Sequence, residues 1–334
     1  MTAPSGRATA IATAQPNIAL VKYWGKRDAA LNLPAAGSLS ITLDALHTRT
    51  ALRFDAALAA DDIVLNGRHD TTGATGIGAF LDLFRARAGV TTHAHVESEN
   101  DFPTGAGLAS SASGFAALAV AANHALGLGL APGELSALAR RGSGSAARSI
   151  FGGFAEMAAG TRADGTDACA AALLAADAWP LEVVVAITTR APKATSSRDG
   201  MEHTRHTSPF YRDWVATVNR DLAEARAAVR ARDFAKLAAV SEASCLAMHA
   251  LMLSARPGLI YWNAATLDCI RCIRALQADG VGVFFTIDAG PQVKAVCLPG
   301  VGSRAAEALR TVAGVQDTVR GGLGAGARVI EAAG

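Results

Sequence analysis

The sequence has almost no net charge, few cysteines and no uninterrupted apolar run long enough to cross a membrane. Its 31 basic and 29 acidic residues leave a formal charge of +2, which argues against a broad nucleic-acid-binding surface. The longest apolar stretch, 115–131, is interrupted by Asn123 and His124 and is too polar to span a bilayer. We therefore expect neither a nucleic-acid partner nor membrane insertion.

The cysteines do not form the pattern of a disulfide framework. They are odd in number and scattered over the second half of the chain, at Cys169, Cys245, Cys269, Cys272 and Cys297. Residues 1–10 contain no basic segment followed by an apolar core, so we expect no secretory signal and a cytoplasmic protein. Cys269-x-x-Cys272 lies in an apolar-periodic segment without a second pair, and we interpret it as core packing.

Periodicity predicts strands first, then helices, then strands again. The strands are expected at 8–22 (broken by a turn at 15–17), 38–43, 51–54, 63–65, 92–98, 181–188, 281–287 and 293–298. The helices are expected at 77–88, 115–126, 132–141, 210–232, 233–253, 261–278 and 303–311. This order predicts an α+β architecture rather than regular βαβ alternation. Near residue 190 an apolar strand is followed by a polar loop and then by long helical segments, which suggests two domains, 1–188 and 189–334.

A glycine- and serine-rich stretch, 101–114, runs directly into the helix expected at 115. Free backbone N–H groups at a helix N-terminus favour an anion, most often phosphate. Ser110 and Ser111 could cap the helix, contact phosphate oxygens or help to hold Mg²⁺. The stretch is neither a Walker A loop nor a dinucleotide-binding G-x-G-x-x-G motif. A flexible connection capped by serine is the alternative.

Three further polar stretches lie between apolar segments: 17–26, 143–148 and 193–198, the last at the start of a polar loop expected over 193–207. With 101–114 they combine cations and hydroxyls in glycine-rich turns, where a ligand can approach the backbone. A solvated surface is the ordinary alternative for each. Together they predict a site for a multiply phosphorylated small molecule, with candidate residues Lys22, Lys26, Ser143, Ser145, Arg148, Ser196, Ser197 and Arg198.

Asp288 ends an apolar strand and begins a Gly-Pro turn. Such an aspartate commonly bonds to the following amides. Beside a lysine or arginine it would instead be a candidate base or orienting group. The pairs His93-x-His95 and His203-x-x-His206 lack a third obvious ligand, so we expect no histidine metal site.

These residues together resemble a known family. PTGAGLASSASG, from Pro103, resembles the P-x(3)-G-L-x-S-S-x-A phosphate loop of the GHMP small-molecule kinase superfamily. With five further motifs, in this order, the chain resembles the diphosphomevalonate decarboxylases over nearly its whole length: NIALVKYWGKRD (from Asn17), LNLP (from Leu31), GSGSAARSIFGG (from Gly142), SSRDGM (from Ser196) and TIDAGP (from Thr286).

The resemblance implies a GHMP-kinase-like α+β fold around a deep cleft. Its N-terminal part, 1–188, would be ribosomal protein S5 domain 2-like and would bind ATP. The helix-rich C-terminal part, 189–334, would be of a ferredoxin-like type and would complete the substrate cleft. The resemblance also implies a homodimer.

The implied reaction belongs to the mevalonate pathway of isoprenoid biosynthesis. Mevalonate 5-diphosphate and ATP, with Mg²⁺ between the phosphates, would give isopentenyl diphosphate, ADP, phosphate and CO₂ through phosphorylation of the 3-hydroxyl. Asp288 would deprotonate or orient that hydroxyl, and Lys22 would stabilise the transferring phosphoryl group or the aspartate. Arg148 would hold the substrate carboxylate. Positioning and charge stabilisation are the main sources of rate in phosphoryl transfer.

The resemblance also implies two sets of binding residues. Those gripping the substrate would be Tyr23, Lys26, Ser143, Ser145, Ser197 and Arg198. Those binding ATP would be Pro103, Gly105, Gly107, Leu108, Ser110 and Ser111. No Mg²⁺ ligands are assigned.

The chain departs from the family pattern at a few positions. Ala36 and Gly37 stand where asparagine and serine are usual, Thr104-Gly105 where threonine is commonly followed by alanine or serine, and Gln292 where asparagine is usual. The first departure leaves open a phosphomevalonate decarboxylase or a mevalonate 3-kinase. A catalytically silent nucleotide-binding protein is an alternative of another class. Retention of Lys22, Arg148 and Asp288 favours the full reaction.

Overall fold

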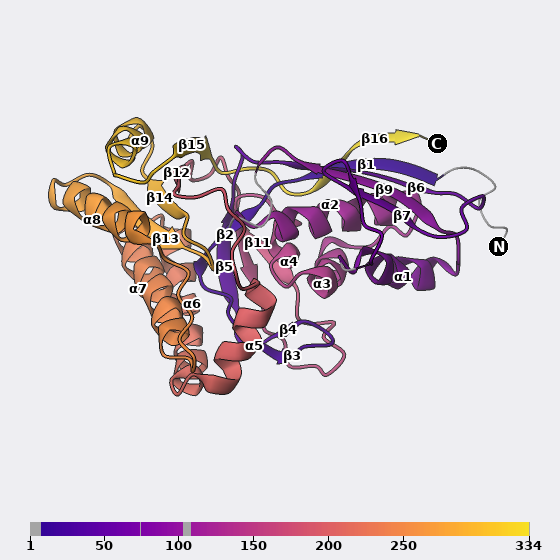
Figure 1. The fold of residues 1–334 in the computed structure, drawn as a ribbon, viewed down its shortest axis with the longest axis horizontal. Helices are drawn as coiled ribbons and strands as arrows, with labels where there is room; N and C mark the ends of the chain where they lie inside the picture. Colours follow the sequence, from indigo (N-terminus) through magenta and orange to yellow (C-terminus); the bar gives the residue numbers. More distant parts are fainter. Residues whose placement is uncertain (1–7, 74, 103–107, 334) are drawn as a thin grey trace.

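The computed structural model describes residues 8–73, 75–102 and 108–333. Helices α1 to α4 cover one face of a large sheet at one end of the molecule (Figure 1). At the other end α7 to α9 pack with a second sheet, and α6 packs against α7. The predicted α+β architecture is confirmed, and most predicted elements occur within a few residues of their expected bounds.

The large N-terminal sheet has the described strand order β16-β1-β6-β9-β7-β8. Its alternating residues place Ala10, Leu52 and Val96 on a buried face. The sequence did not predict β16, which pairs antiparallel with β1. The strands are β1 (Ala8–Ala14), β6 (Thr48–Phe54), β7 (Asp62–Leu65), β8 (Arg68–His69), β9 (Ala94–Asn100) and β16 (Arg328–Ala333).

Helix α2 packs closely on this sheet because its buried residues are small. Ala112, Ala116 and Ala119 are fully buried, and the helix contacts β1 and β6. It begins at Ser110, earlier than the predicted Phe115. A short helix also interrupts the turn expected after residue 142. The helices of this half are α1 (Ile77–Ala88), α2 (Ser110–Ala125), α3 (Pro132–Gly142) and α4 (Ala146–Ser149).

Two smaller sheets pack against the C-terminal helices. One has the order β11-β10-β5-β2 and includes two unpredicted strands; its strands are β2 (Asn17–Val21), β5 (Ser38–Thr42), β10 (Phe154–Met157) and β11 (Ala170–Leu174). The other has the order β13-β14-β12-β15, formed by β12 (Glu182–Ile187), β13 (Val283–Ile287), β14 (Val293–Cys297) and β15 (Asp317–Gly322). The strands β3 (Lys26–Asp28) and β4 (Leu33–Pro34) form a separate hairpin.

The expected polar loop over 193–207 is wrong from residue 197 onward, where a helix begins. Ser196 caps it by accepting a hydrogen bond from the Asp199 N–H at 3.1 Å, while Met201 and Thr204 give the helix a buried face. The C-terminal helices are α5 (Ser197–Thr207), α6 (Tyr211–Ala231), α7 (Phe234–Leu253), α8 (Ala264–Ala278) and α9 (Gly302–Arg310).

Helix α7 is long and apolar enough to be considered as a membrane span, but 56% of its apolar window is buried inside the protein. It packs against α6, β2 and β13, as a core helix does. Cys269 of α8 is fully buried in the hydrophobic cluster between α8, α9 and the sheet that contains β13. Cys272 is partly buried and packs against the same cluster. The interpretation of this cysteine pair as core packing is confirmed.

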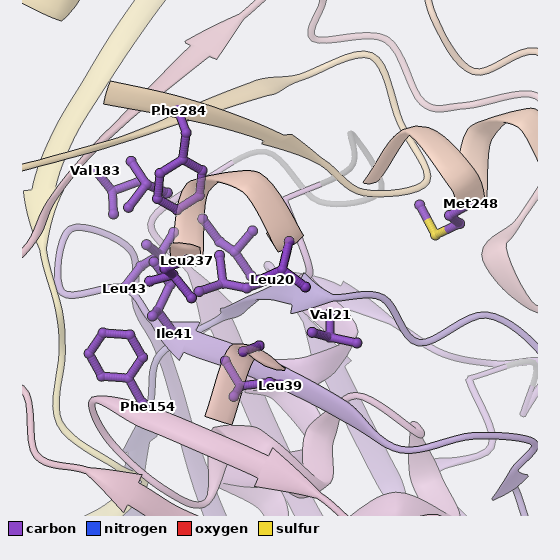
Figure 2. Packing of buried hydrophobic residues seen from close by; sticks show 14 of the residues in the cluster. Leu20, Val21, Leu39, Ile41, Leu43, Phe154, Val183, Leu237, Met248 and Phe284 are labelled. Carbon is purple, nitrogen blue, oxygen red and sulfur yellow. The ribbon is translucent and has the colours of Figure 1, made fainter. Parts of the chain in front are cut away.

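One hydrophobic cluster continues across both halves of the chain. Leu20 and Ile41 of the first half lie with Val183, Leu237 and Phe284 in a common core (Figure 2). The division at residue 188 stays a prediction. This shared core brings the end of β2 and the end of β13 together, and the residues that follow them are Lys22 and Asp288.

We predict that Phe284→Ala destabilises the protein by about 3–5 kcal/mol, because it leaves a large cavity in the shared core. Phe284 is fully buried, and its ring centroid lies 5.3 Å from that of Phe234. Phe210→Ala is the control, since Phe210 is 58% exposed and its truncation should change stability by less than about 0.5 kcal/mol. Urea unfolding of both variants measures this difference, and equal costs would contradict the prediction.

Candidate active site

A cleft of about 820 Å³ lies where the two halves meet, and residues from all four predicted polar stretches line it. These distant stretches therefore converge as predicted. Two carboxylates, Asp199 and Asp288, also line the cleft. Among the described residues six cationic side chains outnumber them: Lys22, Lys26, Arg141, Arg148, Lys193 and Arg198. A surplus of positive charge in a concave site favours an anionic ligand.

Lys22 and Asp288 form an ion pair in the lining of the cleft. Lys22 Nζ donates to Asp288 Oδ1 at 2.8 Å and to the carbonyl oxygen of Ala19 at 2.8 Å. The Lys22 side chain is 1% exposed, whereas that of Asp288 is 26% exposed. The backbone N–H of Lys22 donates to Ser244 Oγ of α7 at 3.0 Å, which fixes the residue after β2.

Asp288 is held in its ionised form. Burial alone would raise the pKa of its carboxyl group, but the ammonium groups of Lys22 and Lys294 outweigh burial and lower the pKa to about 2. Arg148 adds a smaller effect of the same sign. At neutral pH Asp288 is therefore a strong hydrogen-bond acceptor and a weak base.

Arg148 projects from the short helix α4 and is held on several sides. Its Nε donates to Asn17 Oδ1 at 3.2 Å and its Nη1 to Ser38 Oγ at 2.6 Å. The guanidinium carbon lies 6.0 Å from the centre of the Tyr23 ring. Burial lowers the pKa of Arg148 to about 10, so it stays cationic at neutral pH. These contacts fix the position of the guanidinium group.

Serine hydroxyls form a row from the start of α2 toward α4. Ser111 Oγ lies 3.3 Å from Ser143 Oγ, which lies 3.3 Å from Ser145 Oγ. Ala109, at the N-cap position of α2, has a left-handed conformation (φ 58°) and no side-chain oxygen that could cap the helix. Together with Ser110 these residues line the cleft, so the N-terminus of α2 borders it.

The predicted ATP-binding residues fall into three groups. Ser110 and Ser111 line the cleft. Leu108 is 4% exposed and belongs to the shared hydrophobic core, two residues before α2 begins. Pro103, Gly105 and Gly107 lie outside the described residues.

The remaining predicted substrate-binding residues border the cleft near α5. The Tyr23 hydroxyl is buried and has no hydrogen-bond partner within the described part of the chain. Burial raises the pKa of Tyr23 to about 12, so it remains a donor. Burial and the neighbouring Arg198 both lower the pKa of Lys26. Ser197 Oγ accepts a hydrogen bond from Lys193 Nζ at 2.6 Å.

Two lysines near Asp288 were not among the predicted site residues. Lys193 Nζ donates to the Ala289 carbonyl oxygen at 2.9 Å, and its pKa falls to about 8 because of burial and the nearby Lys294. Lys294 Nζ lies 3.5 Å from Asp288 Oδ2. Its signal in the sequence is a lysine inside the apolar segment VKAVC. Lys193 lay within a predicted polar stretch, but nothing there distinguished it from its neighbours.

The departures at 36, 37 and 292 have structural explanations. Ala36 lies in the shared core, and a Cβ at Gly37 would clash with Leu222 of α6. Neither is among the described residues that line the cleft. Gln292 Oε1 accepts from the Thr188 N–H at 2.7 Å, and Gln292 Nε2 donates to the Thr189 carbonyl oxygen at 2.6 Å. Gln292 thus ties the turn after Asp288 to the end of β12.

A second, mostly apolar pocket of about 210 Å³ adjoins the cleft at the start of α2. It shares Ser110 and Ser111 with the cleft, and its polar lining includes Asn66, Ser98 and Asn100. Its apolar lining consists of Leu65, Ile77, Val96, Phe115 and Leu118. An apolar pocket with a few polar groups beside a phosphate-type helix N-terminus suits a flat heterocyclic group.

Comparisons with known proteins agree with this geometry. Residues 14–170 match the diphosphomevalonate decarboxylase-like N-terminal domain, and residues 183–318 match the mevalonate 5-diphosphate decarboxylase C-terminal domain. The chain is 39% identical to the diphosphomevalonate decarboxylase of Eremothecium gossypii over 84% of this chain and 75% of that protein. It is 38% identical to the human enzyme over 84% of this chain and 74% of that protein.

Solved structures match over nearly the whole chain. The mevalonate diphosphate decarboxylase of Staphylococcus aureus is 37% identical, with a TM-score of 0.91 over 99% of this chain and 100% of that chain. A decarboxylase structure in complex with MVAPP, AMPPCP and magnesium is 41% identical, with a TM-score of 0.89 over 98% of this chain and 100% of that chain.

The fold and the cleft are those of the GHMP kinase superfamily, as the resemblance of the motifs implied. Within that superfamily, the chain belongs to the diphosphomevalonate decarboxylase family.

We predict that Gly144→Ala costs about 1–3 kcal/mol of stability, because its Cβ would overlap with the buried Tyr23 hydroxyl and ring. Gly114→Ala is the control: its Cβ would meet no atom within 4 Å, and alanine in a helix should add about 0.5–1 kcal/mol. Thermal unfolding of both variants compares these effects. A Gly144→Ala variant as stable as the unmodified protein would show that Tyr23 is not held against this turn.

Proposed function

We propose that this chain catalyses the ATP-dependent decarboxylation of mevalonate 5-diphosphate to isopentenyl diphosphate. The observation that carries the proposal is the Lys22–Asp288 ion pair, 2.8 Å long, in the lining of a cationic cleft that also holds the fixed guanidinium group of Arg148. Membership of the family supports the same reaction.

ATP would bind across the small pocket and the start of α2. The apolar lining suits the adenine ring, while Ser110, Ser111 and the backbone amides at the start of α2 are placed for the phosphates. The hydroxyls of Ser110 and Ser111 are hard oxygen donors of the kind that Mg²⁺ accepts beside phosphate oxygens and water. When bound, Mg²⁺ would neutralise part of the phosphate charge.

Asp288, which lines the same cleft, would orient the substrate 3-hydroxyl by accepting its hydrogen bond. With a pKa of about 2, it would take the proton only late, after bonding to phosphorus has made the hydroxyl acidic. Lys22 would stabilise the charge on the transferring phosphoryl group. Loss of phosphate then leaves positive charge at C3, which the electrons of the departing carboxylate quench as the double bond forms. Arg148 would hold that carboxylate in line.

The substrate diphosphate would lie near α5 and α4. Lys26 and Arg198 supply charge there, and Tyr23, Ser143, Ser145 and Ser197 supply hydroxyl groups. Because Lys26 and Arg198 add two positive charges beyond the Lys22–Asp288 pair, they favour a diphosphate over a monophosphate. Mevalonate 5-phosphate stays the second candidate substrate, although the departures at Ala36 and Gly37 that left it open lie outside the described lining of the cleft.

We further propose a cytoplasmic homodimer. All five cysteine thiols are free, which suits a reducing compartment. The homodimer rests on the resemblance to the family alone.

The function is tested by measuring CO₂ release from purified protein with mevalonate 5-diphosphate, mevalonate 5-phosphate or mevalonate, each with and without ATP and Mg²⁺. Release that requires ATP and is fastest with the diphosphate is the expected result. No ATP-dependent release from any of the three would refute the proposed function, and preference for the monophosphate would change the substrate.

We predict that Asp288→Asn lowers kcat by about 10²- to 10⁴-fold, because the amide cannot accept the proton or hold the hydroxyl in the same way. ATP binding, measured by calorimetry, should change by less than about threefold, since the nucleotide pocket is untouched. Asp317→Asn, at a side chain that is 52% exposed, is the control. Turnover within tenfold of the unmodified protein would remove Asp288 from the catalytic residues.

We predict a basic limb near pH 8 in the pH profile of kcat/KM. Lys193 carries its charge below its pKa of about 8 and loses it above that pH, so the attraction for substrate phosphates weakens as pH rises. Lys193→Arg should move the limb to higher pH, whereas Lys236→Arg, at a side chain that is 79% exposed, should leave it in place. If the basic limb of the Lys193→Arg variant stays at the same pH, the limb belongs to another titrating group.

A further inference from the structure

Lys294 is a buried lysine, the second residue of the otherwise apolar strand β14. Its side chain is 3% exposed, and its neighbours Val293, Ala295, Val296 and Cys297 are all buried. Strand β14 pairs with β13 on one side and β12 on the other, so neither edge of the strand faces solvent. Lysine is almost never fully buried without a partner. Asp288 is such a partner, since its Oδ2 lies 3.5 Å from Lys294 Nζ.

Each carboxylate oxygen of Asp288 therefore has its own ammonium group. Lys22 Nζ contacts Oδ1 at 2.8 Å, and Lys294 Nζ contacts Oδ2. The backbone fixes this arrangement: Thr286 pairs with Lys294 across the strands, and Thr286 Oγ1 donates to the Ala19 carbonyl oxygen at 3.2 Å. The same carbonyl accepts a hydrogen bond from Lys22 Nζ.

Two lysines around one aspartate leave an extra buried positive charge. A hydrophobic residue at 294 would commonly be as stabilising or more so, so stability alone does not explain the lysine. On α7, burial raises the pKa of Cys245 and lowers that of His249 to about 3, so both are neutral at pH 7. The titratable and charged groups that face Asp288 are Lys22, Lys294, Arg148, Lys193, Cys245 and His249.

The negative charge of the proposed ligands, a diphosphate and ATP, gives Lys294 a role. A diphosphate and a triphosphate bring several negative charges toward Asp288, and like charges favour the protonated form of a carboxyl group. A proton on Asp288 would abolish its ability to accept the substrate hydroxyl. A carboxylate held by Lys22 alone could also rotate about its Cβ–Cγ bond.

We propose that Lys294 is a positioning residue that holds Oδ2 of Asp288, so that the carboxylate stays ionised and aimed into the cleft when the anionic ligands enter. This inference rests on the proposed function, in which Asp288 orients the reacting hydroxyl. Lys294 is not among the described residues that line the cleft, so it would act on the substrate through Asp288.

Lys294→Met tests the inference through the pH profile. We expect kcat to fall by about 10- to 100-fold, because the carboxylate loses its fixed orientation. The KM for the diphosphate should change by less than about threefold. The acid limb of the kcat profile should move up by about one pH unit or more, because one of two nearby cations is lost. Lys294→Arg should restore part of both effects.

Val296→Ala is the matched control, on the same strand and in the shared core but without charge. It should lower the unfolding temperature without moving the acid limb. A Lys294→Met variant with kcat within twofold and an unmoved acid limb would overturn the inference.

A second experiment needs no turnover. Thermal unfolding is compared for the unmodified protein, Lys294→Met, Asp288→Asn and the double variant. Lys294→Met should lower the unfolding temperature when Asp288 is present, and raise it in the Asp288→Asn background, where it removes an uncompensated buried charge. The same change in both backgrounds would refute the ion pair. Absence of CO₂ release by the unmodified protein would refute the proposed function and leave this comparison valid.

Discussion

A carboxylate between two buried ammonium groups, Asp288 with Lys22 and Lys294, sets the conditions for the whole site. Desolvation opposes every charge in this triad, and only mutual contact within a few ångströms compensates for it. Such contact requires the ends of β2 and β13 and the start of β14 to be held in fixed register. The hydrophobic core that runs through both halves of the chain supplies that register. Packing and electrostatics are therefore inseparable here: the core places the charges, and the charges occupy positions that apolar residues would otherwise fill.

The cleft also carries a surplus of positive charge. Lys26, Arg148 and Arg198 face one cavity; burial lowers the pKa of Lys26, and repulsion from the neighbouring Arg198 lowers it further. Anionic ligands would relieve this repulsion between the cationic side chains. The Tyr23 hydroxyl, buried without a partner in the described part of the chain, is likewise a group whose hydrogen bond a ligand can complete. The site is built for the occupied state.

The sequence predicted the parts of this site that depend on local chemistry. Local patterns show Asp288 at the end of an apolar strand, and hydroxyls and cations in glycine-rich turns. The resemblance of the motifs to a family predicted that these residues form one cleft. Lys294 was missed because its meaning depends on a strand pairing that no local pattern contains. Helix α5 was missed because its sequence is strongly polar and only its Ser196 cap and two inward residues favour a helix. Strand β16 was missed because its partner β1 lies at the other end of the sequence.

The pairing of β16 with β1 also constrains the order in which the chain can fold. During synthesis β1 emerges first, and its outer edge has exposed N–H and C=O groups until residues 328–333 have been made. Helix α2, whose N-terminus borders the cleft, rests on β1 and also contacts β16, so the helix has all its packing partners only after β16 has joined the sheet. The nascent chain thus passes through a long stage with an open sheet edge, at which protection by a chaperone would matter most.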